Sequence, residues 1–301
     1  MAEKIKIVFL GTGQAVPTSS RNHSGILLTY KDENILIDCG EGIQRQFRIA
    51  KINPCNLTRI LITHWHGDHI LGIPGLLQTL ALNSYRKKLQ IVIPHHTTHF
   101  LDKMLSMFIT EGKLNMEIKE AENEIITETK DFIINTLSMA HSTRCNAYSF
   151  TEKEKINLDK GKLKKLGLLN NPLCKALKEG KDIEFKGKKI KAASVSYKET
   201  GKKIAFILDT SPNPNIEKLA KNSDLLIIES TYANEEETRA KEYLHLTTKM
   251  AAEEAKKSKV KKLILTHISQ RYEHKAPALL KEAKKLFKNT IIAEDFLALE
   301  V

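Results

Sequence analysis

The strongest constraint on the fold is the recurrence of short apolar, β-branched runs separated by stretches with helical periodicity. Such runs are typical of buried strands, and their alternation with amphipathic helices is typical of α/β proteins. The expected strands cover residues 4–10, 25–30, 34–38, 59–63, 89–94, 132–137, 204–208, 224–229, 262–266 and 290–294. The expected helices cover residues 72–83, 97–108, 236–257 and 276–287. The pattern therefore predicts sheets that carry helices on their outer faces.

Length and composition place the chain among ordinary globular proteins. Its 301 residues suffice for one large α/β domain, and its apolar (41%) and charged (28%) shares exclude disordered and collagen-like classes. No apolar run reaches the roughly 18 residues of a membrane span, and the start MAEKIKIVFLGTG lacks a secretory h-region. The cysteines have neither zinc-finger nor disulfide-framework spacing; they are Cys39, Cys55, Cys145 and Cys174. We therefore expect a cytoplasmic protein with free thiols and no membrane partner.

Positive charge is concentrated in one segment. The chain carries 48 Lys and Arg against 36 Asp and Glu, and residues 151–191 alone contain thirteen lysines and six acidic residues. A basic balance favours polyanionic partners such as nucleic acid, although lysine-rich surfaces also serve solubility. We interpret residues 1–301 as one domain in which residues 152–190 form a basic excursion from the core. A solvated insertion without function is the alternative.

A dense group of potential metal ligands, the HWHGDH motif at residues 64–69, follows one of the expected strands. Residues i and i+2 of an extended loop point the same way, so His64 and His66 can bind one ion. A turn at the glycine can bring Asp68 and His69 to a neighbouring ion. Imidazole and carboxylate ligands suit Zn²⁺, with Mn²⁺ and Fe²⁺ as alternatives. The motif therefore predicts a metal site rather than a surface loop that happens to contain three histidines.

Three other expected strands end beside a residue that can bind metal, namely His141, Asp209 and His267. Loops at strand ends are where α/β proteins place their sites, so we expect these loops to converge on the histidine motif. Read singly, each is an ordinary strand-end side chain; as a set they predict one metal centre. The histidines of PHHTTHF are interpreted instead as a solvated helix end, and His23 and His274 belong to no ligand pattern.

These motifs together resemble the metallo-β-lactamase superfamily and, within it, the ribonuclease Z family, whose endonucleases mature the 3′ ends of transfer RNA. The HxHxDH motif indicates only the superfamily, whereas the segments around His245 and His267 are more specific to the ribonucleases. The resemblance rests on LGTGQAVPTSSRNHSGILL, LIDCGEGIQRQ, ILITHWHGDHILGIPGLL, LGLLNNPLCKALKEG, DLLIIESTY, HLTTKMAAEEAKK and KLILTHISQRY. It implies a four-layer αββα metallo-β-lactamase sandwich with a protruding basic arm.

The resemblance also implies a role for each residue of the site. One Zn²⁺ would be held by His64, His66 and His141, a second by Asp68, His69 and His267, with Asp209 bridging the two. Asp68 would also accept a proton from the attacking water, and His245 would protonate the leaving 3′ oxygen. The implied reaction cleaves the 3′ trailer from precursor transfer RNA, leaving a 3′ hydroxyl on the transfer RNA and a 5′ phosphate on the trailer. The arm would grip the RNA, and the family implies a homodimer.

Three positions depart from the family pattern. Leu208 replaces the glycine that usually precedes the bridging aspartate, which requires a φ angle below zero at this position. Trp65 replaces a smaller apolar residue, and Asn171 replaces the glycine before Pro172 in the arm. Because every ligand is retained, the departures leave the expected chemistry in place.

The residues leave other functions open. A different hydrolase of the same fold, such as a thioesterase or a small phosphodiesterase, would need neither His245 nor the basic segment. A non-catalytic RNA-binding module would have no use for the complete ligand set. His245 is also compatible with an ordinary helix start, and Glu229 either orients His245 or only closes its strand.

Overall fold

The computed structural model describes residues 4–107 and 114–301, so residue 108 of the expected helix 97–108 lies outside the described residues. The chain divides into two compact units. The larger unit contains residues 1–127, 134–150 and 203–301, and the smaller unit contains residues 128–133 and 151–202.

The first sheet combines antiparallel and parallel strands. Its order is β20 (Ala298–Glu300), β1 (Lys6–Gly11), β3 (Gly25–Tyr30), β4 (Glu33–Ile37), β5 (Arg59–Leu61), β6 (Leu89–Pro94) and β7 (Met116–Ala121). Strands β20, β1, β3 and β4 pair antiparallel, whereas β4 to β7 run parallel. The parallel half places the carboxyl end of β5, and therefore the histidine motif, at one edge of the sheet.

The second sheet is also mixed. Its order is β19 (Thr290–Ile292), β17 (Leu263–Thr266), β16 (Leu225–Glu229), β15 (Lys203–Ile207), β10 (Cys145–Glu152), β9 (Phe132–Met139) and β8 (Ile125–Glu128). Strands β15, β16, β17 and β19 run parallel, with Ile228 opposite both Ile207 and Leu265. The loops that follow β15, β16 and β17 therefore leave from the same edge. A short parallel pair, β2 (Gly13–Gln14) and β18 (Ile268–Ser269), joins loops of both halves.

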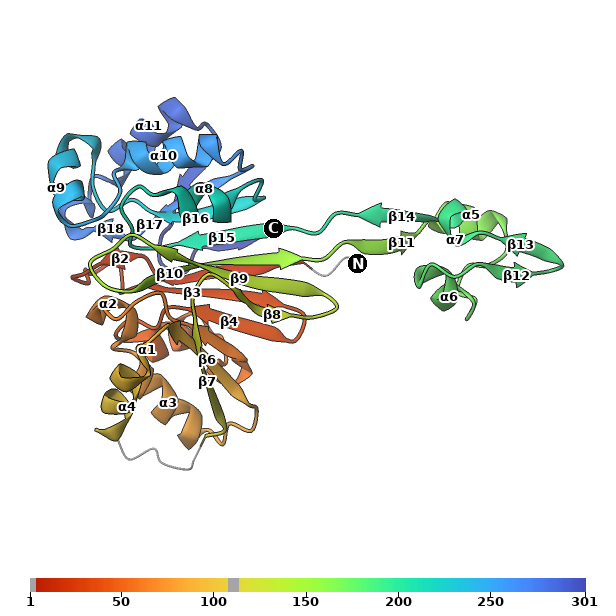
Figure 1. Cartoon of the computed structure of the whole chain (residues 1–301), viewed down its shortest axis with the longest axis horizontal. Helices are drawn as coiled ribbons and strands as arrows, with labels where there is room; N and C mark the ends of the chain where they lie inside the picture. The colour runs from red at the N-terminus through yellow and green to blue at the C-terminus, as the bar shows by residue number, and fades with distance from the viewer. Residues whose placement is uncertain (1–3, 108–113) are drawn as a thin grey trace. The chain divides into compact units, whose positions relative to one another are not determined.

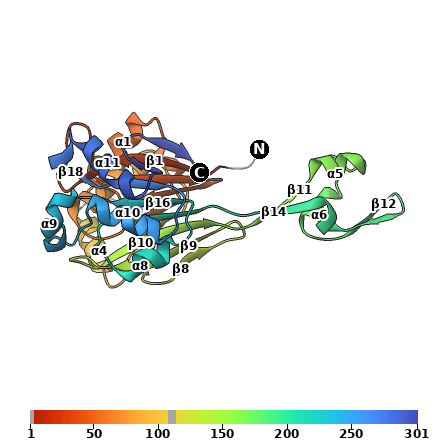
Figure 2. The same cartoon turned by 90° about the horizontal axis from the view of Figure 1, so that it is seen from above.

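The two sheets pack face to face, and helices cover their outer faces (Figures 1 and 2). Side chains of the first sheet such as Leu28 and Ile37 line the same interior space as Tyr148 and Phe206 of the second sheet. Helices α1 (Ile43–Ile49), α3 (Ile73–Leu82) and α4 (Thr98–Ser106) lie beside the first sheet. Helices α8 (Pro214–Ala220), α10 (Thr248–Lys257) and α11 (Ala276–Leu286) lie beside the second sheet.

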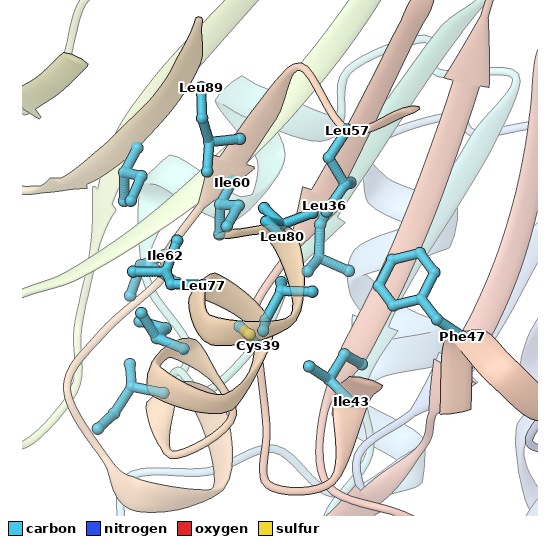
Figure 3. Packing of buried hydrophobic residues seen from close by; sticks show 14 of the residues in the cluster. Leu36, Cys39, Ile43, Phe47, Leu57, Ile60, Ile62, Leu77, Leu80 and Leu89 are labelled. Atoms are coloured by element: carbon cyan, nitrogen blue, oxygen red, sulfur yellow. The ribbon is translucent and has the colours of Figure 1, made fainter. Parts of the chain in front are cut away.

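Branched apolar side chains hold each helical layer on its sheet. Figure 3 shows Leu77 and Leu80 of α3 packed beside Ile60, Leu36 and Cys39, all of them buried. Each buried leucine or isoleucine contributes about 1.5–3 kcal/mol through removal of apolar surface from water. An equivalent cluster holds α8, α10 and α11 on the second sheet. The sites at the strand ends are thus supported by rigid elements.

The smaller unit has two hairpin-like strand pairs and a cluster of its own. Strand β11 (Lys155–Leu158) pairs with β14 (Ser196–Glu199), and β12 (Ile183–Phe185) pairs with β13 (Lys188–Ile190). Helices α5 (Lys160–Lys165), α6 (Cys174–Lys178) and α7 (Ala192–Val195) complete it. Its buried apolar side chains are Leu163, Leu168, Leu177, Ile183, Ile190, Ala192 and Val195. The basic excursion expected at residues 152–190 falls within this unit, and its role stays a prediction.

The expected helix at 236–257 is wrong as one element. The chain forms a short 3-10 turn at Asn234–Glu236 and helix α9 (Glu237–Glu242), then breaks, and α10 starts only at Thr248. Leu244 takes a left-handed φ of 58°, and Tyr232 bridges Thr247 across the gap. The periodic apolar residues continue across the break, which is why periodicity alone does not reveal it.

Several strands were not expected from the sequence. Strand β10, CNAYSFTE, is nearly all buried despite its polar residues, and β7 and β8 are rich in Glu and Thr. Polar residues interrupt their apolar ones, so none of them forms a continuous apolar run in the sequence. The four cysteines are free, as expected. Within the described part of the chain, the structure contains no helix of the length and apolar character that a membrane crossing requires.

Candidate metal centre and active site

The histidine motif lies between the carboxyl end of β5 and a one-turn helix, α2 (Gly67–Ile70). The backbone at His66 is extended, with φ −70° and ψ 148°, and helix α2 begins at the next residue. The turn carries Asp68 and His69 away from the direction of the first two histidines, as the spacing predicts. His64 and His69 are fully buried, so the motif is not a solvated surface loop.

The first ligand cluster joins the motif to the loop after β9. Nε2 of His64 lies 3.0 Å from Nδ1 of His66, which lies 3.3 Å from Nε2 of His141. The carboxylate of Asp209, in the loop after β15, lies 3.5 Å from His64 Nε2 and 3.8 Å from His141 Nε2. These four side chains lie close enough to share one cation.

The second ligand cluster joins the motif to the loop after β17. Nε2 of His69 lies 3.2 Å from Nε2 of His267, and Oδ2 of Asp68 lies 3.4 Å and 3.3 Å from these two nitrogens. Asp209 faces this cluster as well, because its Oδ2 lies 3.5 Å from His69 Nε2 and its Oδ1 lies 3.1 Å from His267 Nε2. All seven ligand-type residues predicted from the sequence therefore converge.

Hydrogen bonds to the outer ring nitrogens fix where these histidines carry a proton. Nδ1 of His69 donates to Asp38 at 2.6 Å, and Nδ1 of His64 donates to the hydroxyl of Thr63 at 3.0 Å. The Thr63 hydroxyl itself donates to Asp38 at 2.8 Å. Asp38 therefore supports one histidine of each cluster. The sequence offered only a weak signal for it, an Asp at the end of an expected strand.

The other two outer partners come from distant loops. Nδ1 of His141 donates to the carbonyl of Leu244 at 3.2 Å, so the break before α10 also orients a ligand. Nδ1 of His267 donates to the hydroxyl of Thr231 at 3.0 Å, and Thr231 donates to Glu229 at 2.7 Å. Neither partner carries a signal in the sequence, because each acts through tertiary contact.

This arrangement fits bound metal. Nε2 of His69 and Nε2 of His267 face each other at 3.2 Å, and a cation between them would be bound by both nitrogens once these are deprotonated. Oδ1 of the buried Asp209 has no hydrogen-bond partner among the described residues. Buried carboxylates without partners are costly unless they coordinate metal. The donor set, imidazole and carboxylate, is that of divalent transition metals.

The electrostatics keep the carboxylates ionised. Burial raises the pKa of Asp209, but the neighbouring imidazoles outweigh it and hold that pKa well below its ordinary value. The same opposition lowers the pKa of Asp68. Burial lowers the pKa of His64, so that ring is neutral and able to bind a cation. The backbone at Asp209 and His267 has positive φ, 32° and 58°, a conformation that non-glycine residues adopt at a cost of about 1–3 kcal/mol.

His245 belongs to neither of the two clusters above, but it lies close enough to Asp209 and His267 to form a third group of possible ligands with them. Its Nδ1 lies 3.0 Å from Oε1 of Glu229, a fully buried carboxylate, and its side chain is 7% exposed. Burial lowers the pKa of His245, but Glu229 outweighs it and raises that pKa to about 9. The peptide N–H groups of Thr210 and Leu246 also donate to Glu229, which fixes the carboxylate. Glu229 thus orients His245 rather than merely closing its strand.

The clusters open into a cleft of about 530 Å³. Asp68, His141, Asp209, Tyr232 and His245 are among the residues that line it. Part of the ligand-type set and the candidate acid therefore face the same open space, which a substrate can enter.

The remaining histidines lie elsewhere or act differently. His95 and His96 form a separate group with Glu120, whose carboxylate accepts hydrogen bonds from the Thr98 hydroxyl and from the backbone at the start of α4. The Thr98 hydroxyl is the main cause of a Glu120 pKa of about 2. His23, which the sequence analysis assigned to no pattern, is buried and bonds to the carbonyl of Ala15.

The departures from the family pattern leave the clusters intact. Leu208 keeps φ below zero, as expected, and the positive φ falls on Asp209 instead. Trp65 packs against Phe100, with ring centroids 5.6 Å apart, and so is held away from the neighbouring ligands. In the turn before Pro172, Asn170 has the left-handed backbone, with φ 63°, and Asn171 does not.

Two facing mixed sheets with a largely buried His/Asp cluster at their strand ends, of which only His66 is exposed among the seven ligand-type residues, are typical of metal-dependent hydrolases of the metallo-β-lactamase fold. Comparison with known proteins identifies the family within this class. The chain is 38% identical to a ribonuclease Z of Archaeoglobus fulgidus, over 98% of this chain and 97% of that protein. It is 37% identical to a ribonuclease Z of Enterococcus faecalis, over 99% of this chain and 97% of that protein. The chain belongs to the ribonuclease Z family.

Solved structures and a family model agree with this fold. The structure of human tRNase Z, short form, matches with a TM-score of 0.71 and 26% identity, over 98% of each chain. The metallo-β-lactamase fold protein YhfI from Bacillus subtilis matches with a TM-score of 0.72 and 19% identity, over 99% of this chain and 100% of that chain, which shows the fold alone. Residues 5–163 also belong to the family described as "Anti-Pycsar protein Apyc1". That match includes His64 to His141 but ends before Asp209, His245 and His267.

Proposed function

We propose that this chain removes the 3′ trailer from precursor transfer RNA by hydrolysing one phosphodiester bond. Membership of the ribonuclease Z family over nearly the full length supports the proposal, as does the likeness to human tRNase Z. The observation that carries it is His245, an imidazole outside the predicted ligand set that Glu229 holds in the cleft. A ribose 3′ oxygen is a poor leaving group and needs such an acid.

Two divalent cations, preferably Zn²⁺, complete the proposed site. His64, His66, His141 and Asp209 would hold one, and Asp68, His69, His267 and Asp209 the other. When bound, such ions supply Lewis acidity that lowers the pKa of water and stabilises charge on the phosphate. The position of Asp209, with one oxygen 3.5 Å from both His64 and His69, supports its role as the bridge.

Asp68 is the proposed proton acceptor for the attacking water. It lines the cleft, and its low pKa keeps it ionised at neutral pH. Its Oδ2 accepts a hydrogen bond of 2.8 Å from the Ala15 N–H, which fixes the plane of the carboxylate. A fixed carboxylate can orient the water and take its proton as the new phosphorus–oxygen bond forms.

His245 is the proposed general acid. Its Nδ1–H donates to Glu229, so Nε2 is the atom that gives a proton to the leaving 3′ oxygen. Glu229 raises its pKa to about 9, so the imidazolium is present at neutral pH. A positioned acid of this kind contributes about 10²- to 10⁴-fold in rate. The products are a 3′ hydroxyl on the transfer RNA and a 5′ phosphate on the trailer.

The basic arm, residues 152–190, is the proposed RNA-binding part of an otherwise single catalytic domain. It lies in the smaller unit, whose own apolar cluster leaves its lysines at the surface. A cavity of about 600 Å³ there is lined by Lys165, Lys186, Lys188, Lys189 and Lys191. Such a concentration of lysines supports binding to the phosphate backbone.

A homodimer is the proposed assembly. Membership of the ribonuclease Z family supports the proposal, because the resemblance implies a dimer. Exposed apolar side chains are available on the helical layer of the first sheet: Leu82, the last residue of α3, is 82% exposed, and Leu71, just before α3, is 53% exposed. Light scattering of the purified protein should give a mass near twice 34.1 kDa, and a stable mass near 34.1 kDa would contradict the dimer.

The test of the reaction is to map the cut on one precursor transfer RNA that carries a 3′ trailer. We expect cleavage directly after the discriminator base, with a 3′ hydroxyl on the transfer RNA, and loss of cleavage with a chelator. Cleavage of bis(p-nitrophenyl) phosphate with no cut in the precursor would instead favour a small phosphodiesterase of the same fold.

A further inference from the structure

The candidate proton acceptor Asp68 depends on a strained peptide next to it. The Ala15 N–H that binds Asp68 belongs to a tight turn in which Val16 N–H donates to the Gln14 carbonyl at 2.5 Å. Ala15 has φ 50°, in the left-handed region, which costs a non-glycine residue about 1–3 kcal/mol. Without other contacts this turn would relax to negative φ and rotate the N–H away from Asp68.

His23 supplies a contact that holds the turn. Its Nε2 lies 3.0 Å from the Ala15 carbonyl, and because a carbonyl only accepts, Nε2 carries the proton. Nδ1 of His23 is buried and has no hydrogen-bond partner among the described residues. The ring is 5% exposed, so it makes this one polar contact inside the protein.

The surroundings of His23 leave its ring little freedom. A Cβ on Gly40 would come within 2.5 Å of the His23 Cβ and 2.6 Å of the Asp68 carbonyl. Glycine at this position therefore lets His23 and the Asp68 backbone approach each other. The neighbouring Asn22 is anchored as well, since its N–H donates to Asp295 and its side chain to the Glu41 carbonyl.

We propose that His23 is a positioning residue for Asp68: its Nε2–H fixes the Ala15 peptide, and the Ala15 N–H fixes the Asp68 carboxylate. The inference rests on the role of Asp68 in the proposed function. It gives a function to the buried His23, which belongs to neither ligand cluster. Removing the bond leaves the substrate contacts in place and frees the carboxylate, so kcat falls while KM stays nearly unchanged.

The experiment compares His23→Phe, which keeps an aromatic ring without the donor, with His23→Gln, whose amide can donate. We expect kcat on precursor transfer RNA to fall about tenfold or more in His23→Phe, as is typical when support behind a metal-site residue is lost, with KM within about twofold. His23→Gln should recover most of this loss. The exposed His274 provides a matched control, and His274→Phe should behave as the wild type.

A second measurement separates positioning from general stability. The chelator concentration that removes half of the metal is measured for His23→Phe with Asp68 and with Asp68→Asn. If His23 acts through Asp68, the two substitutions are non-additive, whereas a merely structural effect adds in both backgrounds. His23→Asn, too short to reach Ala15, replaces His23→Phe if the latter does not fold.

Full kcat in the folded His23→Phe protein, or additive effects with Asp68→Asn, would overturn the inference. If the wild type itself does not cut precursor transfer RNA, the proposed function fails instead. In that case the metal-retention cycle still decides whether His23 supports Asp68.

Discussion

At the scale of single residues, the site depends on hydrogen bonds that decide where each imidazole keeps its proton. Asp38 and Thr231 hold the outer nitrogens of His69 and His267, and this leaves the inner nitrogens free for metal. Asp209 faces both clusters, which no other of the seven candidate ligands does within the described part of the chain. The contribution of each residue to metal binding therefore depends on which atoms its side chain faces, and not only on its residue type.

Replacing Asp209 should therefore affect metal content most. We expect Asp209→Ala to lower the metal bound per chain more than His66→Ala does, because only Asp209 serves both clusters. Elemental analysis of the purified proteins, after dialysis in the same buffer, measures this. Full metal occupancy in Asp209→Ala would contradict the proposal that Asp209 binds both cations.

Replacing His245 should show whether this residue acts as a general acid or as a metal ligand. We expect His245→Ala to keep its metal and its affinity for precursor transfer RNA, while turnover falls about 10²-fold or more. On bis(p-nitrophenyl) phosphate, whose leaving group needs no proton, the loss should be much smaller. Equal losses on both substrates would argue against general-acid catalysis by His245.

The Glu229–His245 pair predicts a pH dependence. The acid works as the imidazolium, which is present below its pKa of about 9 and is lost as pH rises through that value. Bound cations nearby lower the value, so we expect kcat to fall on the alkaline side at or below pH about 9. Glu229→Gln removes the charge that raises this pKa, so the alkaline limb should move to lower pH. Coinciding profiles of kcat against pH for the two proteins would contradict the pairing.

At the scale of elements, the break between α9 and α10 contains His245 and places its side chain at the cleft. The hydroxyl of Thr247 accepts a hydrogen bond from the Met250 N–H at 3.3 Å and so caps α10. Leu244 precedes His245 in the chain, and its carbonyl accepts a hydrogen bond from Nδ1 of His141. One irregular segment thus fixes the acid, orients a ligand and starts a helix.

Removing this cap should weaken the helix start. Thr247→Val keeps the volume and loses the hydroxyl, so we expect the free energy of unfolding to fall by about 1 kcal/mol, the usual worth of an N-cap. Urea denaturation followed by circular dichroism measures it. An unchanged midpoint and slope would show that the hydroxyl does not cap α10 in solution.

At the scale of the whole molecule, the proposal assigns chemistry to the larger unit and RNA binding to the smaller one. Leu158 and Ser196 are register partners on β11 and β14, so a two-residue Asn-Gly turn can join them after residues 159–195 are removed. The deletion takes away eleven lysines and four acidic residues. It keeps the larger unit and its cleft unchanged.

We expect the deleted protein to keep its metal content and its hydrolysis of bis(p-nitrophenyl) phosphate. Binding of precursor transfer RNA should weaken, and the slope of log affinity against log salt should flatten by about 0.7–0.9 per lost phosphate contact. A protein with Lys186, Lys188 and Lys189 replaced by Gln is the control that retains the fold of the unit. Unchanged kcat/KM and salt slope after the deletion would favour an insertion without function.

The sequence by itself determined the strand pattern and identified the seven side chains that the fold brings together as candidate ligands. The apolar runs are continuous because strands buried on both faces need no polar positions, and that is why β3 and β6 match the expected ranges. The spacing of His64, His66, Asp68 and His69 is local, so an extended loop and one turn suffice to predict its two directions. Chemistry encoded within a few residues can be read without a fold.

Only the tertiary structure decided which groups support the candidate ligands and where His245, the proposed acid, lies. Asp38, Thr231 and the Leu244 carbonyl act across gaps of tens to a hundred residues, so no local pattern identifies them. The break before α10 was hidden because its apolar residues keep helical spacing while their hydrogen bonds go to Glu229 and Tyr232. Hydrogen bonds between distant segments depend on the order of the strands in a sheet. That order cannot be predicted from the sequence of any single strand.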